Sequence, residues 1–124
     1  MKKAINTSNA PAAIGPYSQA IEANGFVYIS GQLPINPADG SMPDEIKAQT
    51  RQSLSNLKAI LAERGLDMSA VVKTTVLLAD MSLFVPMNEV YAEFFESPYP
   101  ARAAFAVKEL PKQALVEIEA VAAI

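Results

Sequence analysis

The sequence predicts an α+β fold in which six strands form a sheet and two amphipathic helices cover one of its faces. Three observations indicate this fold: an Asn24-Gly25 pair between two apolar runs, two stretches with helical apolar periodicity, and several apolar segments of strand length. The chain has 124 residues, of which 51% are hydrophobic and 19% charged. This composition fits one folded domain that spans residues 1–124.

The N-terminal part of the chain predicts three strands. Lys3–Thr7 is a candidate edge strand, and the proline- and glycine-containing segment Asn9–Tyr17 predicts an ordered loop. Because Asn-Gly is a strong turn signal, Ser18–Glu22 and Phe26–Ser30 are expected to pair as a hairpin. Gly31 follows this hairpin; it is either an ordinary turn residue or a place where a ligand or another chain comes close to the backbone.

The middle of the chain predicts two helices separated by a strand. The first helix is expected to run from a cap at Asp44 or a neighbouring residue to the residues before Gly65. Val71–Ala79 is rich in β-branched residues, which predicts a largely buried strand. Asp80 or Ser82 is expected to cap the second helix. The apolar face of that helix is expected to comprise Phe84, Met87, Val90, Tyr91, Phe94 and Phe95.

The segment Pro100–Glu119 contains the last two strands and places two charges, Arg102 and Glu117, among apolar residues. An unpaired buried charge is very costly, so such groups are usually paired, hydrated or used in function. The residues alone leave open half-exposed strands, a structural ion pair of Glu117 with Arg102 or a lysine, and a functional site. The small side chains of Ala104 and Ala106 share the strand face of Arg102, which suits a pocket.

The chain contains no histidine and no cysteine. This excludes zinc sites built on imidazole or thiolate, and it excludes nucleophilic pairs that use either residue. Glu117 is then the best-placed acid or base, because an apolar setting raises the pKa of a carboxyl group. Glu119 shares its strand parity and is a rival. Tyr17 and Asn88 offer further polar groups, whose simplest roles are packing and solvation.

Charge and hydropathy bear on the partners of the chain. The formal net charge of −3 gives no electrostatic reason to expect nucleic-acid binding. No apolar run approaches the roughly 20 residues of a membrane span, and no hydrophobic region follows Lys2 and Lys3, so no membrane partner and a cytoplasmic location are expected. Both faces of Val71–Ala79 are mainly apolar, whereas two helices cover only one face, which predicts a closed homo-oligomer.

Five motifs resemble the RidA (YjgF) family of reactive-intermediate deaminases: Ala12–Ala20, Ser30–Pro34, Asn88–Tyr91, Pro100–Arg102 and Glu117–Ala120. The resemblance runs nearly end to end. It implies a chorismate-mutase-like fold, with a mixed six-stranded sheet and two helices on one face. It also implies a homotrimer with a central barrel and active sites in clefts between neighbouring subunits.

The same resemblance implies an enzyme of metabolite damage control. Members of the RidA subgroup hydrolyse 2-imino acids (2-iminobutanoate and 2-iminopropanoate), which pyridoxal-phosphate-dependent dehydratases release, to 2-keto acids and ammonia. The resemblance implies no cofactor and no metal. A trimer that binds 2-keto acids or regulates a partner without turnover remains the alternative, whereas RNA cleavage is disfavoured by the acidic composition and the missing histidine.

The family motifs also assign roles to individual residues. Arg102 matches the arginine that binds the substrate carboxylate, Glu117 the acid that positions and activates water, and Tyr17 a catalytic tyrosine of the pocket. Further wall positions match Ser30, Gly31, Asn88 and the backbone of Ala104. The family commonly reads Arg-Ser-Cys where this chain reads Arg102-Ala103-Ala104. Redox behaviour that depends on that cysteine is therefore not expected here.

Overall fold

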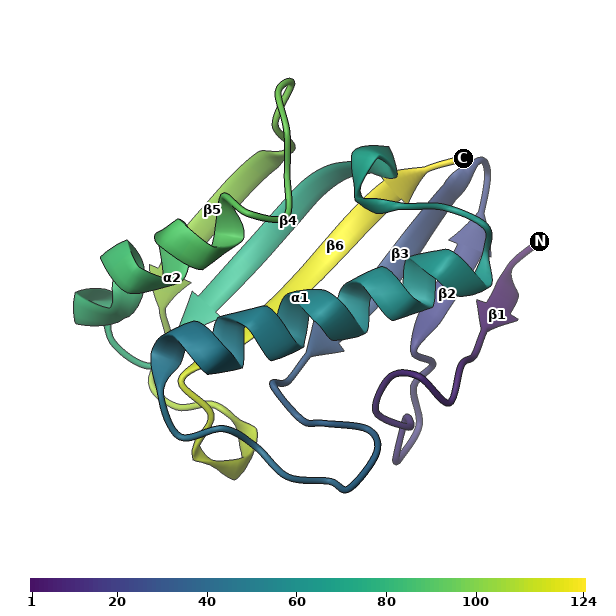
Figure 1. Cartoon of the computed structure of the whole chain (residues 1–124). Coiled ribbons are helices and arrows are strands. Elements are labelled where there is room, and N and C mark those ends of the chain that lie inside the picture. Colours follow the sequence, from purple (N-terminus) through teal and green to yellow (C-terminus); the bar gives the residue numbers. More distant parts are fainter.

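The computed structural model describes all 124 residues and contains one mixed sheet with two helices on the same side (Figure 1). The elements are β1 (Lys3–Ile5), β2 (Ala20–Ala23), β3 (Phe26–Gln32), α1 (Ile46–Glu63), β4 (Val71–Leu78), α2 (Phe84–Tyr91), β5 (Ala101–Ala106) and β6 (Val116–Ala123). The strand order is β1-β2-β3-β6-β4-β5, and only the β4–β5 pair is parallel. The predicted fold class is confirmed.

The first three strands form as predicted, with β1 at one edge of the sheet. Asn24 and Gly25 have φ angles of 53° and 83°, the two positive values that a tight hairpin turn of this twist requires. Val27 and Ile29 of β3 are buried beneath the helices, and Tyr28 between them points to the other face.

Helix α1 begins at Ile46 and is capped by Glu45, the residue after Asp44. The Glu45 carboxylate, rather than that of Asp44, accepts hydrogen bonds from the backbone N–H groups of Lys47 (3.0 Å) and Ala48 (2.6 Å). The helix ends before Gly65, whose φ of +77° requires the conformational freedom of glycine. Neither α1 nor α2 is long and apolar enough to cross a membrane.

Buried polar side chains on α1 connect the helix to neighbouring loops, which the apolar pattern did not indicate. Asn56 donates to the carbonyls of Leu33 (3.1 Å) and Ile35 (2.9 Å), and these residues follow β3. Gln49 accepts a hydrogen bond from the N–H of Leu115, directly before β6. The helix therefore fixes the ends of the two central strands as well as covering them.

Helix α2 is shorter than predicted. The expectation that Phe94 and Phe95 belong to it is wrong, because α2 ends at Tyr91 and the chain continues in tighter turns. The N–H of Phe94 donates to the carbonyl of Tyr91, three residues earlier, in place of a helical bond. Phe95 still enters the core, where its ring lies 4.6 Å from the ring of Tyr91, centroid to centroid.

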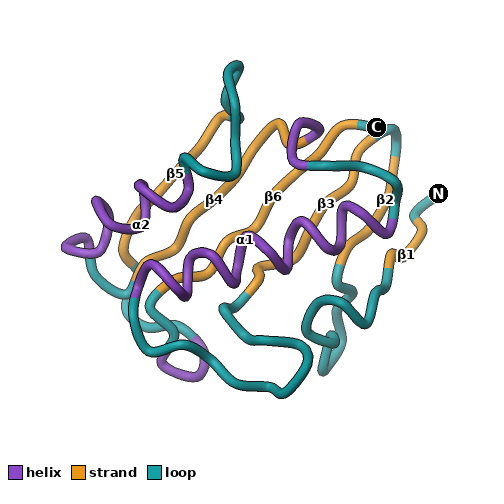
Figure 2. The backbone as a smooth tube through the Cα atoms, in the orientation of Figure 1, coloured by secondary structure: helices purple, strands orange, loops and turns teal.

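Both helices lie on one side of the sheet, in front of the strands in Figure 2, and no helix covers the opposite face. Large apolar side chains lie on this face in the open: Phe26 is 39% exposed, Tyr28 48% and Phe105 46%. Leu77 of β4 lies between Phe105 and Glu117 in the cross-strand register. The predicted uncovered apolar face is confirmed, and such a face usually packs against another molecule.

We expect Leu57→Ala to lower the free energy of unfolding by about 2–5 kcal/mol, because Leu57 of α1 is fully buried in the core and its truncation leaves a cavity. Urea unfolding at a fixed protein concentration measures the change. The adjacent exposed Lys58→Ala is the control and should change the stability by less than about 0.5 kcal/mol. Equal effects of the two substitutions would contradict the packing described here.

Candidate active site

The sheet register divides the predicted site residues between two faces. Arg102 pairs with Thr74, a fully buried residue that faces the helices. Glu117 pairs with Leu77, which points to the uncovered face. Within one chain, Arg102 and Glu117 therefore lie on opposite sides of the sheet. The three ion pairs of the structure, Lys47–Glu89, Arg51–Glu93 and Arg64–Glu22, involve neither residue. The structural ion pair between Arg102 and Glu117 is therefore excluded within the chain.

Arg102 lies against α2, in a group that we name the arginine cluster: Arg102, Phe84, Asn88 and Tyr91. Its guanidinium carbon lies 4.7 Å from the centroid of the Tyr91 ring and 5.4 Å from that of Phe84. The Asn88 amide oxygen accepts a 2.6 Å hydrogen bond from Arg102 Nη1. Asn88 is thus more than a solvated helix residue, because it holds the arginine.

Ala104 lies two residues after Arg102 in β5, so its side chain is on the same face, where it packs against the core. The N–H of Val107 donates to the carbonyl of Leu78 on β4. Since backbone groups alternate along a strand, those of Ala104 point the other way, to the free edge of β5. The backbone of Ala104 is therefore available to a ligand or another chain beside the arginine cluster.

Glu117 lies with Gly31 on the uncovered face. A β-carbon on Gly31 would come within 2.5 Å of a carboxylate oxygen of Glu117, so any larger residue would displace that carboxylate. Gly31 belongs to β3 itself, at the irregularity between Ile29 and Gln32, and is not a turn glycine beyond the strand. The missing side chain provides the space that the carboxylate occupies.

The pKa of Glu117 is raised, first by burial and second by the neighbouring charge of Glu119. Burial disfavours the ionised form because it removes water, and Leu77 on the paired strand is one apolar neighbour. No ion pair offsets this effect. A carboxylate with a raised pKa and no cationic partner is a better proton acceptor than an ordinary surface glutamate.

The side chain of Ser30 is joined to the N-terminal loop that carries Tyr17. The Ser30 hydroxyl donates a 2.6 Å hydrogen bond to the carbonyl of Ser18, the residue after Tyr17. Tyr17 itself is 55% exposed. We name Tyr17, Ser30, Gly31 and Glu117 the glutamate cluster.

Gln19 holds this loop, and the sequence did not single it out. Its buried side chain accepts a hydrogen bond from the N–H of Thr7 (2.7 Å) and donates to the carbonyls of Thr7 (3.0 Å) and Pro11 (2.8 Å). The only signal for it in the sequence was a polar side chain inside the predicted strand Ser18–Glu22. The other residues missed were Phe84 and Tyr91, which the helical pattern assigned to the core, and Thr74.

Comparisons with known proteins identify relatives of this chain. Residues 7–124 match the sequence profile of the family described as Endoribonuclease L-PSP. A RutC family protein of Pyrococcus horikoshii is 54% identical over 98% of each chain. A crystal structure of a Rid family protein from Yersinia pestis superposes with a TM-score of 0.97, at 46% identity over 100% of both chains.

A protein of Bos taurus named 2-iminobutanoate/2-iminopropanoate deaminase is 50% identical, over 98% of this chain and 90% of its own. This chain belongs to the RidA (YjgF) family. The fold expected from the resemblance, a chorismate-mutase-like mixed sheet with two helices on one face, is thereby confirmed.

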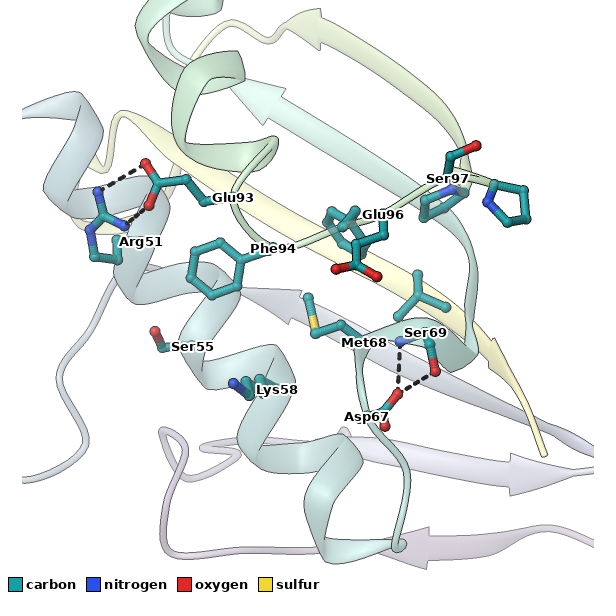
Figure 3. A pocket seen from close by; sticks show the side chains of 14 residues that line it. Arg51, Ser55, Lys58, Asp67, Met68, Ser69, Glu93, Phe94, Glu96 and Ser97 are labelled. Carbon is teal, nitrogen blue, oxygen red and sulfur yellow. Dashed lines mark hydrogen bonds and ion pairs between the residues drawn. The ribbon is translucent and has the colours of Figure 1, made fainter.

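Two surface cavities of this RidA-family protein differ in their relation to the predicted residues. The larger, about 750 Å³, lies between α1 and the chain after α2, and none of the predicted site residues lines it (Figure 3). Two of its charged side chains, Arg51 and Glu93, form an ion pair with each other. The smaller cavity, about 300 Å³, lies on the uncovered face and is lined by Ser30 and Glu119.

The raised pKa of Glu117 predicts how stability depends on pH. Because the folded state binds this proton more tightly than the unfolded state, the associated stabilisation is present below the unfolded pKa of about 4.3 and is lost as pH rises through the folded pKa. Glu117→Gln cannot ionise. The variant should therefore gain unfolding free energy relative to the wild type as pH rises, which urea unfolding across this range measures.

Glu119→Gln is the matched control for this prediction. It leaves the Glu117 carboxyl group in place but removes the charge that helps to raise its pKa. The loss of stability with rising pH should then be smaller and end at a lower pH than in the wild type, because only the folded-state pKa is lowered. Parallel curves for the wild type and Glu117→Gln would show that burial does not disfavour the ionised carboxylate.

Proposed function

We propose that this RidA-family protein hydrolyses 2-imino acids such as 2-iminobutanoate and 2-iminopropanoate. Water adds to the C=N carbon of the protonated imine, the carbon–nitrogen bond then breaks, and the products are the 2-keto acid and ammonia. The name of the Bos taurus relative, at 50% identity, supports this reaction and substrate class. We propose that the protein itself supplies the groups required, without a cofactor.

The observation that carries the proposal is the state of Arg102. Its guanidinium is exposed and has no carboxylate partner in the chain, yet it is held by two aromatic rings and by Asn88. A fixed, unneutralised guanidinium is suited to a planar carboxylate, with which it can form two parallel hydrogen bonds. A 2-imino acid carries such a carboxylate next to its reactive carbon.

We propose that each active site forms between two copies of the chain. The arginine cluster and the glutamate cluster lie on opposite faces, so one copy cannot bring them to the same substrate. A head-to-tail contact places the arginine cluster of one copy against the uncovered face of the next, and such a contact generates a ring when the rotation between copies closes. The trimer expected of the family is such a ring, and it would bury the apolar side chains of this face.

In this arrangement the protein acts mainly by positioning the substrate and the attacking water. Arg102 holds the substrate carboxylate, with the backbone of Ala104 beside it. Glu117 of the neighbouring copy accepts a proton from water as the oxygen attacks carbon, and returns a proton to the departing nitrogen. Tyr17, Ser30 and Gly31 form the wall around that water, with Asn88 keeping Arg102 in place. Burial raises the pKa of Glu117 above that of an ordinary glutamate, which makes its carboxylate a better proton acceptor.

A coupled assay tests this function. A threonine dehydratase supplies the imine, and the release of 2-oxobutanoate is compared with its release in water alone. We expect the wild type to accelerate the release. Arg102→Ala should lower kcat/KM about a hundredfold, through loss of the charged hydrogen bonds, and Glu117→Gln about 10²- to 10⁴-fold, through loss of the base.

Arg51→Ala is the control for the assay, because Arg51 is an exposed arginine that is already paired with Glu93 and belongs to neither cluster, so its loss should not affect turnover. Full acceleration by Arg102→Ala would contradict the role of this residue. Binding of 2-oxobutanoate without imine turnover would instead favour a binding or regulatory protein. Cleavage of a synthetic RNA would favour the activity that the family description names.

Mixed assemblies test whether the site is shared between copies. Arg102→Ala and Glu117→Gln chains are each expected to be nearly inactive. When the two variants are co-expressed and assemble at random, about a quarter of the contacts join an intact arginine cluster to an intact glutamate cluster, so about a quarter of wild-type activity should return. No recovery in assemblies shown by mass spectrometry to be mixed would place both residues in one chain's site.

A further inference from the structure

The side chain of Arg102 is held by one stripe of α2. Phe84, Asn88 and Tyr91 follow the spacing i, i+4, i+7, which places them on one face of the helix. All three contact the guanidinium, two through their rings and one through its amide oxygen. An exposed arginine is ordinarily mobile, and these contacts restrict it to one orientation.

Tyr91 is itself fixed from below. It is 6% exposed, and its hydroxyl lies 2.7 Å from the hydroxyl of Thr74, which is completely buried in β4. Thr74 is the direct cross-strand neighbour of Arg102. Thr74 of β4 thus contacts Tyr91 of α2, and Tyr91 contacts Arg102 of β5, which pairs with Thr74. Burial raises the pKa of the Tyr91 hydroxyl, so the ring remains neutral under the cation.

The hydrogen bonds of Arg102 leave one edge of its guanidinium free. Nη1 donates to Asn88, whereas Nε and Nη2 have no hydrogen-bond partner in the chain. The Nε and Nη2 donors form a parallel pair that matches the two oxygens of a carboxylate.

We propose that Tyr91, Phe84 and Thr74 are positioning residues that hold the Arg102 guanidinium flat against α2, with its Nε–Nη2 edge open to the carboxylate of a 2-imino or 2-oxo acid. The proposal rests on the function proposed above and adds residues that do not touch the substrate. Holding the guanidinium in place before binding reduces the conformational entropy that is lost when the carboxylate binds. The residues should therefore govern affinity more than the chemical step.

Binding and kinetics of variants test this role. Tyr91→Leu should raise the Kd for 2-oxobutanoate about tenfold, with an equal rise in KM and a kcat within about twofold of wild type. Tyr91→Phe retains the ring and should stay within about threefold. Phe95→Leu is the matched control. It removes a buried ring that packs against Tyr91 in the hydrophobic core but lies outside the arginine cluster, so it should lower stability and leave the Kd unchanged.

The NMR resonance of the Arg102 Nε–H group gives a readout that needs no turnover. In the wild type the aromatic rings should shift this resonance away from those of the other arginines. Tyr91→Leu should move it toward them, whereas Tyr91→Phe and Phe95→Leu should not. If Tyr91→Leu does not fold, Phe84→Leu replaces it, because Phe84 is only partly buried, with an expected rise in Kd of about threefold.

The outcomes separate this proposal from the proposed function. Wild-type turnover together with an unchanged Kd and resonance in folded Tyr91→Leu or Phe84→Leu would overturn the positioning role alone. A wild type that binds 2-oxobutanoate without hydrolysing imines would overturn the proposed reaction, and the Kd series would still decide the role of Tyr91. A fall in kcat of the same size as the rise in KM would also overturn the proposal, because a positioning residue for binding does not produce it.

Discussion

Successive side chains of a β-strand leave opposite faces of the sheet, and the arrangement of this molecule follows from that alternation. The register pairs Arg102 with Thr74 and Glu117 with Leu77, so the cation is directed toward the helices and the carboxylate away from them. No side-chain rotation can bring the two charges together across a sheet. Chemistry that needs both therefore requires a second molecule to complete the site.

The two charges are accommodated in different ways. Arg102 keeps its charge against aromatic rings, which attract a cation without neutralising it. Glu117 lies in a partly apolar setting with no cation beside it, and the result is a raised pKa. The first arrangement gives a strong, permanent binding group and the second gives a group that can exchange a proton. Each environment suits the chemistry that the residue type can perform.

Much of the fold could be predicted because its signals are local. Asn24-Gly25 specified the hairpin, and the apolar stripe together with Gly65 specified α1. The end of α2 could not be predicted, because no helix breaker lies between Tyr91 and Pro98 and the Phe95 ring still packs against Tyr91 in the core. Their charge among apolar residues singled out Arg102 and Glu117, and the motif resemblance gave them roles, but neither showed the faces on which they lie. That separation depends on the register of β4 with β5 and β6, which is a property of paired strands and not of either strand alone.

Gly31 also links two positions that are far apart in the chain. Its missing β-carbon leaves the space in which the Glu117 carboxylate lies, so a side chain at position 31 requires that carboxylate to move. A larger residue at position 31 can be accepted once position 117 has become small, and that change removes the carboxylate. No sequence of single substitutions in this region therefore retains both a side chain at position 31 and an acid in its present place. Glycine at position 31 is therefore set by the Glu117 carboxylate and not by the backbone conformation of the strand.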